Sequence, residues 1–238
     1  MYTQQANEAR EFITQKINTS CIENYPFRHL VIDDFLPKSL YRQINRHFPD
    51  YSDVGFHDLM KPKYRFIKSV FDLETKNTKQ EARDIYNIFS QIFDKALAVS
   101  IINKFDIKID SEIAWMCDYC WDFPNNNQRA LAPHTDHDTK IVSMVIYLPI
   151  VETPLRFNDG QIQYLPMPGT DLLIQNSDES FTKVREVEAK SNRMTMFCKN
   201  GMSWHSVEPT QYPRKTITMF IINPEGCKCT EGFSYKHL

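Results

Sequence analysis

Two histidines and one aspartate are the residues of this chain best suited to hold a metal ion. His134 and Asp136 stand two positions apart in APHTDHDTK, residues 132–140. In an extended segment, residues i and i+2 point to the same face, so this imidazole and this carboxylate can converge on one ion. A further ligand must come from a distant strand, and His205 in GMSWHSVEP offers it. Two imidazoles and one carboxylate with open positions are typical of non-haem Fe(II) sites.

The residues that follow, His137 and Asp138, are better suited to another role. We expect them to cap or solvate the turn, with a place at the substrate mouth as the alternative for His137. A polar loop or a local Asx-type turn is also the alternative for His134 and Asp136 when they are taken alone. This alternative loses most of its weight when His205 and the arginine after it are considered together.

Arg214 begins the strand-like segment RKTITMFII, nine residues after His205. On a strand it shares one face with Thr216 and Phe220. An inward-facing arginine in a β-sandwich is costly without an anionic partner, and residues 215–222 contain no Asp or Glu. A small dicarboxylate would supply that partner, because a guanidinium group fits a carboxylate through two hydrogen bonds.

The elements that must position these residues change in character near residue 110. Before it, helical patterns cover 5–17, 38–48 and 79–103, with a strand at 28–37 and a long loop at 49–65. After it, short apolar or alternating runs separated by turn residues predict eight strands, at 111–121, 141–148, 161–165, 171–175, 182–188, 194–199, 204–207 and 215–222. Strands at this spacing suggest a sandwich or barrel, with the jelly roll as the natural candidate.

We therefore predict an α+β, mainly β fold in one domain. A double-stranded β-helix (jelly roll) forms the core at 109–224, mainly helical residues 1–108 support it, and 225–238 form a C-terminal tail. The loops 49–65 and 122–133 are the expected substrate elements, because loops at the rim of a rigid sandwich often carry specificity.

Composition narrows the possible partners. The 238 residues include 28 basic and 30 acidic side chains, a net charge of −2, which does not indicate a nucleic-acid partner. No apolar run approaches the ~20 residues that cross a bilayer, so we expect no membrane partner. The N-terminal residues do not resemble an export signal, and we expect a cytoplasmic location with reduced cysteines. A zinc site at Cys117, Cys120, Cys227 and Cys229 is disfavoured, because the first pair would point to opposite faces of a strand.

The complete pattern resembles that of the Fe(II)/2-oxoglutarate-dependent oxygenases, in particular their prolyl 4-hydroxylase-like branch. Three segments carry the resemblance, which covers most of the chain: HTDHDTKIVSMVIYLP, then NRMTMFCKNGMSWHSVEP with PRKTIT after it, and the N-terminal YPFRHLVIDDFLPKSLYRQINRHFP. The resemblance implies that His134, Asp136 and His205 are the catalytic iron ligands. It also implies that Arg214 binds the distal carboxylate of 2-oxoglutarate.

Three more cosubstrate-binding residues follow from the resemblance. Tyr147 matches a tyrosine that hydrogen-bonds the same carboxylate, with ordinary sandwich core as the alternative. Thr216 matches the Ser or Thr two residues after the arginine. Many members place a tyrosine about ten residues before the first histidine, where this chain has DFPNNNQRALAP. Tyr119 is the nearest candidate there, and a core or surface phenol is its alternative.

The implied activity is a dioxygenase (hydroxylase) reaction that uses Fe(II), the cosubstrate 2-oxoglutarate and O₂, with ascorbate as a further candidate cofactor. Oxidative decarboxylation would release succinate and CO₂ while a substrate C–H bond is hydroxylated. The carboxylate at Asp136 favours hydroxylation, because related halogenases have a small residue there. The sequence does not identify the substrate: we expect a small molecule, an amino acid or a peptide, and peptidyl proline, a free amino acid, a carrier-bound residue and a sugar-like molecule are the alternatives. The alternatives are a non-catalytic jelly roll that binds a small ligand, and a cupin-like metalloenzyme of other chemistry.

Overall fold

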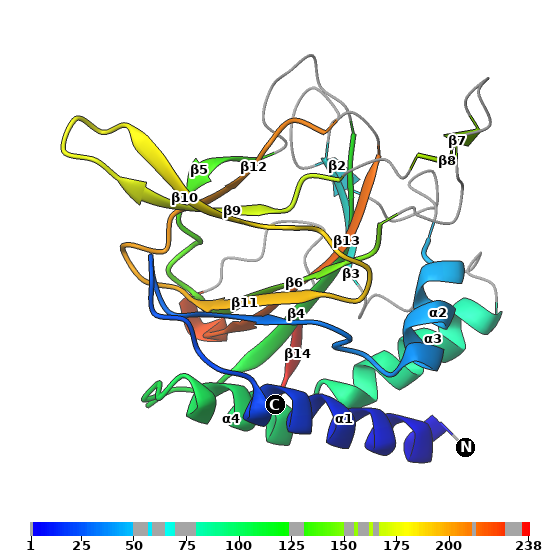
Figure 1. The fold of residues 1–238 in the computed structure, drawn as a ribbon. Helices are drawn as coiled ribbons and strands as arrows, with labels where there is room; N and C mark the ends of the chain where they lie inside the picture. The colour runs from blue at the N-terminus through cyan, green and yellow to red at the C-terminus, as the bar shows by residue number, and fades with distance from the viewer. Residues whose placement is uncertain are drawn as a thin grey trace.

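The structure is a computed structural model that describes residues 2–49, 57–58, 65–69, 80–123, 131–149, 155–156, 162–163, 167–210, 213–226 and 235–238. Two antiparallel sheets face each other, and helices cover the outer side of the larger sheet (Figure 1). The predicted mainly β fold with N-terminal supporting helices is confirmed.

The larger sheet has eight strands in the order β1-β11-β6-β13-β4-β3-β2, and β14 pairs with β4. Its strands are β1 (His29–Ile32), β2 (His57–Asp58), β3 (Arg65–Ser69), β4 (Ala114–Asp122), β6 (Lys140–Tyr147), β11 (Met194–Cys198), β13 (Arg214–Ile222) and β14 (Tyr235–His237). The two longest, β4 and β13, lie side by side in the middle and are buried on both faces.

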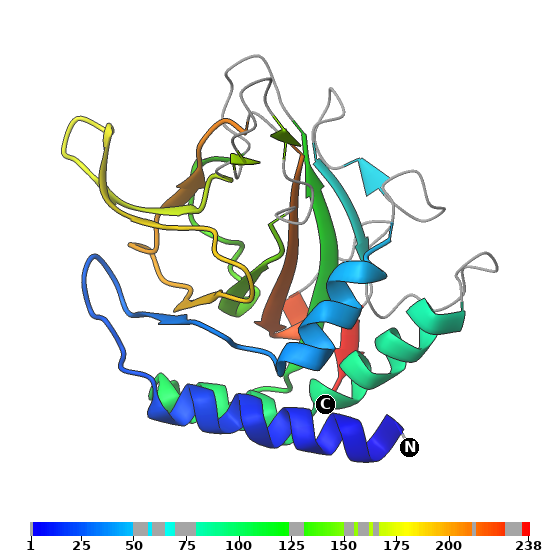
Figure 2. The ribbon, with the colours of Figure 1, turned by 45° about the vertical axis from the view of Figure 1, so that its right-hand side comes forward.

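The smaller sheet lies over one face of the larger sheet, as Figure 2 shows. Its order is β10-β9-β12-β5, with β5 (Leu131–His134), β9 (Thr170–Gln175), β10 (Phe181–Val187) and β12 (His205–Val207). A separate two-stranded ribbon joins β7 (Leu155–Arg156) and β8 (Ile162–Gln163), and one 3-10 turn, η1 (Pro224–Gly226), follows β13.

Four helices form the supporting layer: α1 (Tyr2–Thr19), α2 (Lys38–Arg46), α3 (Gln80–Ile92) and α4 (Lys95–Lys104). The prediction of one continuous helix over 79–103 was wrong. The chain breaks at Asp94, whose side chain accepts a hydrogen bond of 2.9 Å from the backbone N–H of Leu97 and caps the N-terminus of α4. Arg10 of α1 forms an ion pair with the same carboxylate and ties the first helix to this corner.

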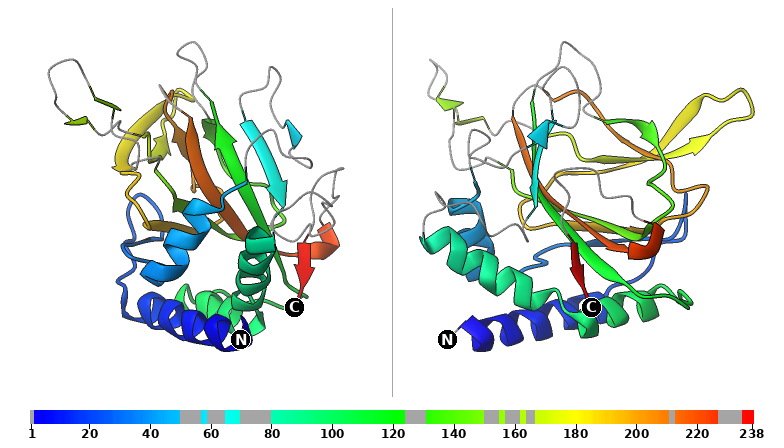
Figure 3. Two further views of the ribbon diagram at one scale, coloured as in Figure 1. Left: turned by 90° about the vertical axis from the view of Figure 1, so that its right-hand side faces the viewer. Right: turned by 180° about the vertical axis from the view of Figure 1, so that it is seen from behind.

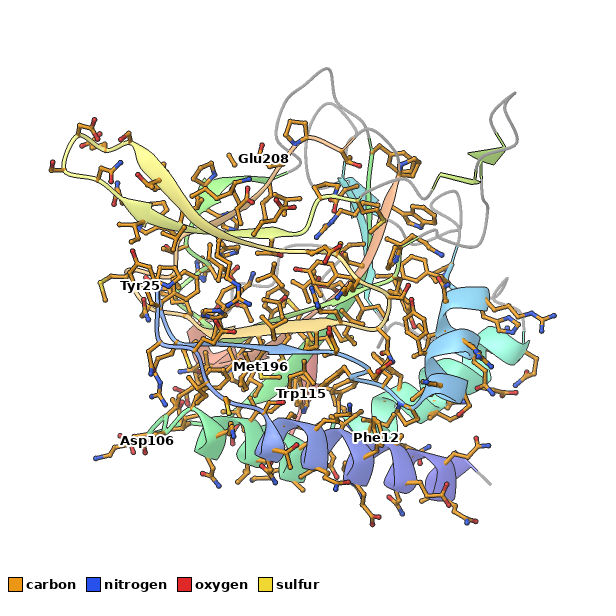
Figure 4. The ribbon with its side chains drawn as sticks, viewed as in Figure 1. Phe12, Tyr25, Asp106, Trp115, Met196 and Glu208 are labelled. Atoms are coloured by element: carbon orange, nitrogen blue, oxygen red, sulfur yellow. The ribbon has the colours of Figure 1, made fainter. Side chains whose placement is uncertain are left out.

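The larger sheet separates two apolar regions. Its outer face packs against α1, α3 and α4 in the main core, and Trp115 and Met196 lie in this layer in Figure 4. Its inner face meets the smaller sheet in a second cluster that includes Phe27, Tyr147 and Phe197. The views in Figure 3 show the helices on one side of the larger sheet and the smaller sheet on the other. The predicted site residues must therefore be sorted by face.

Several elements differ from the sequence prediction. The structure adds β5, β14 and the β2–β3 pair. The loop predicted at 49–65 lies mostly outside the described residues, as do parts of 122–133, 161–165 and the tail 225–238. None of the helices in the described part of the chain is long and apolar enough to span a membrane.

Candidate active site

His134 and His205 are direct cross-strand partners on β5 and β12, so their side chains share one face of the smaller sheet. Their ring centroids lie 4.2 Å apart. Each Nδ1 is hydrogen-bonded to the carbonyl two residues earlier, Ala132 O at 2.9 Å and Ser203 O at 3.0 Å. Because a carbonyl only accepts, each Nδ1 donates a proton to it, and Nε2 is the ring nitrogen that is suited to bind a metal ion.

Asp136 follows β5 and is held by two residues of β6. Its Oδ2 accepts a hydrogen bond of 2.5 Å from Ser143 Oγ, and its Oδ1 accepts one of 2.6 Å from Lys140 Nζ. Oδ2 also lies 3.7 Å from Nε2 of His205. Ser143 belongs to the larger sheet and His205 to the smaller sheet. Asp136 contacts both residues and therefore connects the two sheets next to the two histidines.

Two pKa shifts favour metal binding at neutral pH. Burial disfavours the charged form of Asp136, but Lys140 and His205 outweigh this effect and lower its pKa to about 2. Burial lowers the pKa of His205 to about 4, although Asp136 acts in the opposite direction. At pH 7 the aspartate is therefore ionised and His205 is neutral, which are the protonation states that bind a cation.

These three residues fit a metal ion by their donor set. One ligand atom from each of His134, Asp136 and His205 lies within 4.8 Å of the others. Two imidazoles and one carboxylate match the donor set of the 2-His-1-carboxylate sites of non-haem Fe(II) oxygenases. The structure thus brings together the residues that the sequence predicted as the metal site.

Arg214 is buried on the inner face, as expected, but its partner differs from the prediction. Asp122 stands opposite it on β4, and Arg214 Nη1 donates a hydrogen bond of 2.6 Å to Asp122 Oδ2. Arg214 Nε donates to the carbonyl of Pro168 at 3.1 Å. The sequence argument found no Asp or Glu within strand 215–222 and suggested a dicarboxylate as the partner, whereas the neighbouring strand β4 already supplies an anion.

Thr216 and Tyr147 are cross-strand partners beside Arg214 on the same inner face. The Thr216 hydroxyl is fully buried and has no hydrogen-bond partner among the described residues. An orphaned buried hydroxyl is costly, so a ligand that accepts its hydrogen bond fits this position. Tyr147 Oη is already bonded to Thr170 Oγ1 at 2.6 Å and Thr195 Oγ1 at 3.2 Å, and its role towards a cosubstrate stays a prediction.

The structure does not bring Tyr119 to this group. It is the register partner of Ile217, whereas Thr216 and Arg214 point to the other face of the sheet. Its ring packs edge-on against Phe48, with centroids 5.0 Å apart, in the main core between the larger sheet and the helices. The structure therefore places Tyr119 in the core, as the alternative interpretation of this residue expected.

The neighbours of the metal motif behave as the sequence indicated. His137 Nδ1 lies 3.0 Å from Thr139 Oγ1 at the exposed turn, and Asp138 pairs with Lys199. Both therefore belong to the turn. Cys117 and Cys120 are buried free thiols on opposite faces of β4, which speaks against a shared zinc ion at this pair.

Three residues at the site were missed from the sequence: Lys140, Ser143 and Asp122. Lys140 stands four residues after Asp136, and this spacing was a usable signal for a side chain that could reach back to the carboxylate. Ser143 and Asp122 gave no such signal, because their contacts depend on the distance between sheets and on strand register.

Comparisons with known proteins give a family match for part of the chain and several similar folds. Residues 119–222 match the family model of the 2OG-Fe(II) oxygenase superfamily. No curated protein matches the chain. A solved prolyl hydroxylase of Trichoplax adhaerens, in complex with a hypoxia inducible factor peptide fragment, is 14% identical with a TM-score of 0.55. The match covers 93% of this chain and 92% of that one.

Two further solved structures are similar over most of their length. AtDAO1, the dioxygenase for auxin oxidation 1 of Arabidopsis thaliana with 2-oxoglutarate, is 13% identical, with a TM-score of 0.53 and coverage of 91% of this chain and 90% of that one. The α-ketoglutarate-dependent epimerase SnoN from nogalamycin biosynthesis is 10% identical, with a TM-score of 0.50 and coverage of 92% and 87%. At such low identities the structural similarity shows a shared double-stranded β-helix fold and no more, and the names of the two proteins give different reactions, oxidation and epimerisation.

Proposed function

We propose that the chain is a member of the 2OG-Fe(II) oxygenase superfamily, whose family model matches residues 119–222, and that it hydroxylates an unactivated C–H bond of an amino-acid or peptide substrate, with release of succinate and CO₂. The observation that carries the proposal is that ligand atoms of His134, Asp136 and His205 lie within 4.8 Å of one another. The complex of the similar Trichoplax hydroxylase with a peptide fragment supports this substrate class.

Each residue of the site has a distinct task in this proposal. The Nε2 atoms of His134 and His205 bind Fe(II) together with the carboxylate of Asp136. Ser143 and Lys140 hold that carboxylate in place through its two oxygens. When bound, Fe(II) with 2-oxoglutarate and O₂ supplies the oxidant that breaks the substrate C–H bond.

The cosubstrate would be held from the inner face of the larger sheet. Arg214 and the orphaned hydroxyl of Thr216 bind its distal carboxylate. The presence of a carboxylate ligand at Asp136, where halogenases have a small residue, supports hydroxylation as the reaction. The family match favours this oxygenase activity over a non-catalytic jelly roll and over a cupin-like metalloenzyme.

The test is an anaerobic titration with Fe(II) and then 2-oxoglutarate, followed by a screen of amino acids and peptides for coupled succinate release. We expect His134→Ala and His205→Ala to lose Fe(II) binding while their circular dichroism spectra stay unchanged. His137→Ala is the matched control, because its side chain lies in the exposed turn. Full Fe(II) affinity in both ligand variants would exclude the proposed metal site.

A further inference from the structure

Arg214 and Asp122 form a buried ion pair at the position proposed for the distal carboxylate of the cosubstrate. The two residues face each other at the end of β4 and the start of β13, and their side chains are 1–2% exposed. The carboxylate–guanidinium distance is 2.6 Å. A buried guanidinium that binds an anionic ligand therefore already has a permanent anion beside it.

This pairing leaves part of the guanidinium group available. Nη1 is bonded to Asp122 and Nε to the carbonyl of Pro168, whereas Nη2 makes no hydrogen bond to a described residue. Thr216, on the same face of β13, adds its buried hydroxyl with no described partner. A second carboxylate could accept hydrogen bonds from Nη2 of Arg214 and from the Thr216 hydroxyl. Arg214 would then bind two anions at once.

Two carboxylates on one buried guanidinium repel each other. Like charges a few ångströms apart interact strongly where water is excluded, so the Asp122 charge weakens the binding of any anion to Arg214. The negative charge of Asp122 also balances the positive charge of Arg214 before a ligand binds. The electrostatic free energy that a ligand carboxylate gains by binding to Arg214 is therefore smaller.

We propose that Asp122 is a built-in competitor of the cosubstrate: its carboxylate shares Arg214 with the distal carboxylate of 2-oxoglutarate and thereby sets the affinity for this cosubstrate. The inference rests on the proposed function. It makes Asp122 a positioning residue that acts through Arg214, and it gives the pocket a weaker preference for a dicarboxylate than the arginine alone would produce.

The test uses the Mn(II)-loaded protein, which binds the cosubstrate without turnover, and isothermal titration calorimetry with two ligands. One ligand is 2-oxoglutarate and the other is 2-oxobutyrate, which lacks the distal carboxylate. We expect Asp122→Asn to bind 2-oxoglutarate at least tenfold more tightly than the wild type, because the amide oxygen can still accept from Nη1 without the charge. The affinity for 2-oxobutyrate should change less than twofold.

The matched control is Asp118→Asn. Asp118 is also buried and lies on the same face of β4, but it stands opposite Thr218. This variant should change the affinity for 2-oxoglutarate less than threefold. Asp122→Glu keeps the negative charge and should have an affinity for 2-oxoglutarate within threefold of the wild type. If Asp122 had a purely structural role, the neutral variant would not bind 2-oxoglutarate more tightly than the two charged proteins.

Asp122→Ser replaces the asparagine variant if that protein does not fold. If the wild type binds 2-oxoglutarate and the folded neutral variants bind it equally well or more weakly, the inference is overturned and the proposed function stays intact. No binding of 2-oxoglutarate by the wild type or by any variant would overturn the proposed function and the inference together. Binding by the neutral variant alone would support the inference in its strongest form.

Discussion

At the scale of single residues, the site is defined by which atoms are already engaged. Nδ1 of both histidines is bound to a backbone carbonyl, so Nε2 is the ring nitrogen through which each could bind a metal ion. Asp136 is different, because Lys140 already occupies one of its oxygens. Lys140 also lies 3.6 Å above the ring of Phe220, which holds its ammonium group near the proposed metal position.

This arrangement predicts the effect of Lys140→Met. The ammonium group shares the carboxylate with the metal and repels it, so its removal should tighten Mn(II) binding about tenfold, or ~1.4 kcal/mol. Ser143 still orients Oδ2 in the variant. Calorimetric titration with Mn(II) measures the effect. Lys199→Met is the control, because Lys199 pairs with the exposed Asp138, two residues after Asp136. Weaker Mn(II) binding by Lys140→Met would contradict the interpretation.

The buried His205 predicts a pH-dependent stability of the metal-free protein. Its pKa is lowered to about 4 in the folded state and is 6.5 in the unfolded chain. Between these values the unfolded state holds a proton that the folded state lacks, so stability falls as the pH is lowered from 6.5 towards 4.

Urea unfolding with a chelator at pH 7 and pH 5 measures this linkage. The wild type should lose about 2 kcal/mol more between these pH values than His205→Gln, which cannot take up the proton. Equal losses in the two proteins would show that His205 does not titrate in this way.

At the scale of elements, strand register decides which residues meet. Gly169 precedes β9 and lies against the end of β10: a Cβ at this position would stand 1.7 Å from the carbonyl oxygen of Val187. The neighbouring Pro168 accepts from Arg214, and Thr170 binds the hydroxyl of Tyr147. The absence of a side chain at Gly169 thus lets the smaller sheet reach the cosubstrate residues.

Gly169→Ala should therefore lower the free energy of unfolding by about 1–3 kcal/mol and weaken 2-oxoglutarate binding to the Mn(II)-loaded protein. The backbone must move to relieve the overlap, and residues 168 and 170 move with it. Gly201→Ala is a close control, because no atom lies within 4 Å of the added Cβ. Urea unfolding and calorimetry test both variants, and a Gly169→Ala protein with unchanged binding would exclude the coupling.

The same register explains what the sequence could and could not predict. The i, i+2 spacing of His134 and Asp136 depends on local geometry alone, and the structure brings these residues to His205 as expected. The face of Tyr119 was not readable, because β4 is buried on both sides and shows no alternation of polar and apolar residues. Asp122 was missed as the partner of Arg214, since a cross-strand pair is fixed only once both strands are in register.

The break between α3 and α4 was missed for a different reason. The apolar spacing continues through Phe93 and Leu97, so periodicity alone predicts one helix. The signal that could have revealed the break is Asp94, since an aspartate three residues before a helical backbone N–H is a favoured N-cap.

At the scale of the whole molecule, the larger sheet divides support from chemistry. The main core lies between its outer face and the helices, whereas the proposed metal and cosubstrate residues all lie between the two sheets. Met196 and Phe197 are neighbours on β11 that point to these two sides: Met196 belongs to the helix-facing core, and Phe197 packs 4.7 Å from the ring of His205, measured between centroids. Both side chains are almost completely buried.

This division predicts separable effects of two adjacent substitutions. Met196→Ala should lower the free energy of unfolding by about 2–5 kcal/mol, and Phe197→Ala by about 3–5 kcal/mol, because each leaves a cavity in a packed region. Only Phe197→Ala should also weaken Mn(II) binding, by tenfold or more, since the ring that supports His205 is lost. Unfolding by urea in the presence of a chelator gives the stabilities, and calorimetry well below the melting temperature gives the affinities. Equal losses of Mn(II) affinity in the two variants would show that the helix-facing core and the metal site are coupled through the sheet, and that the division proposed for the molecule does not hold.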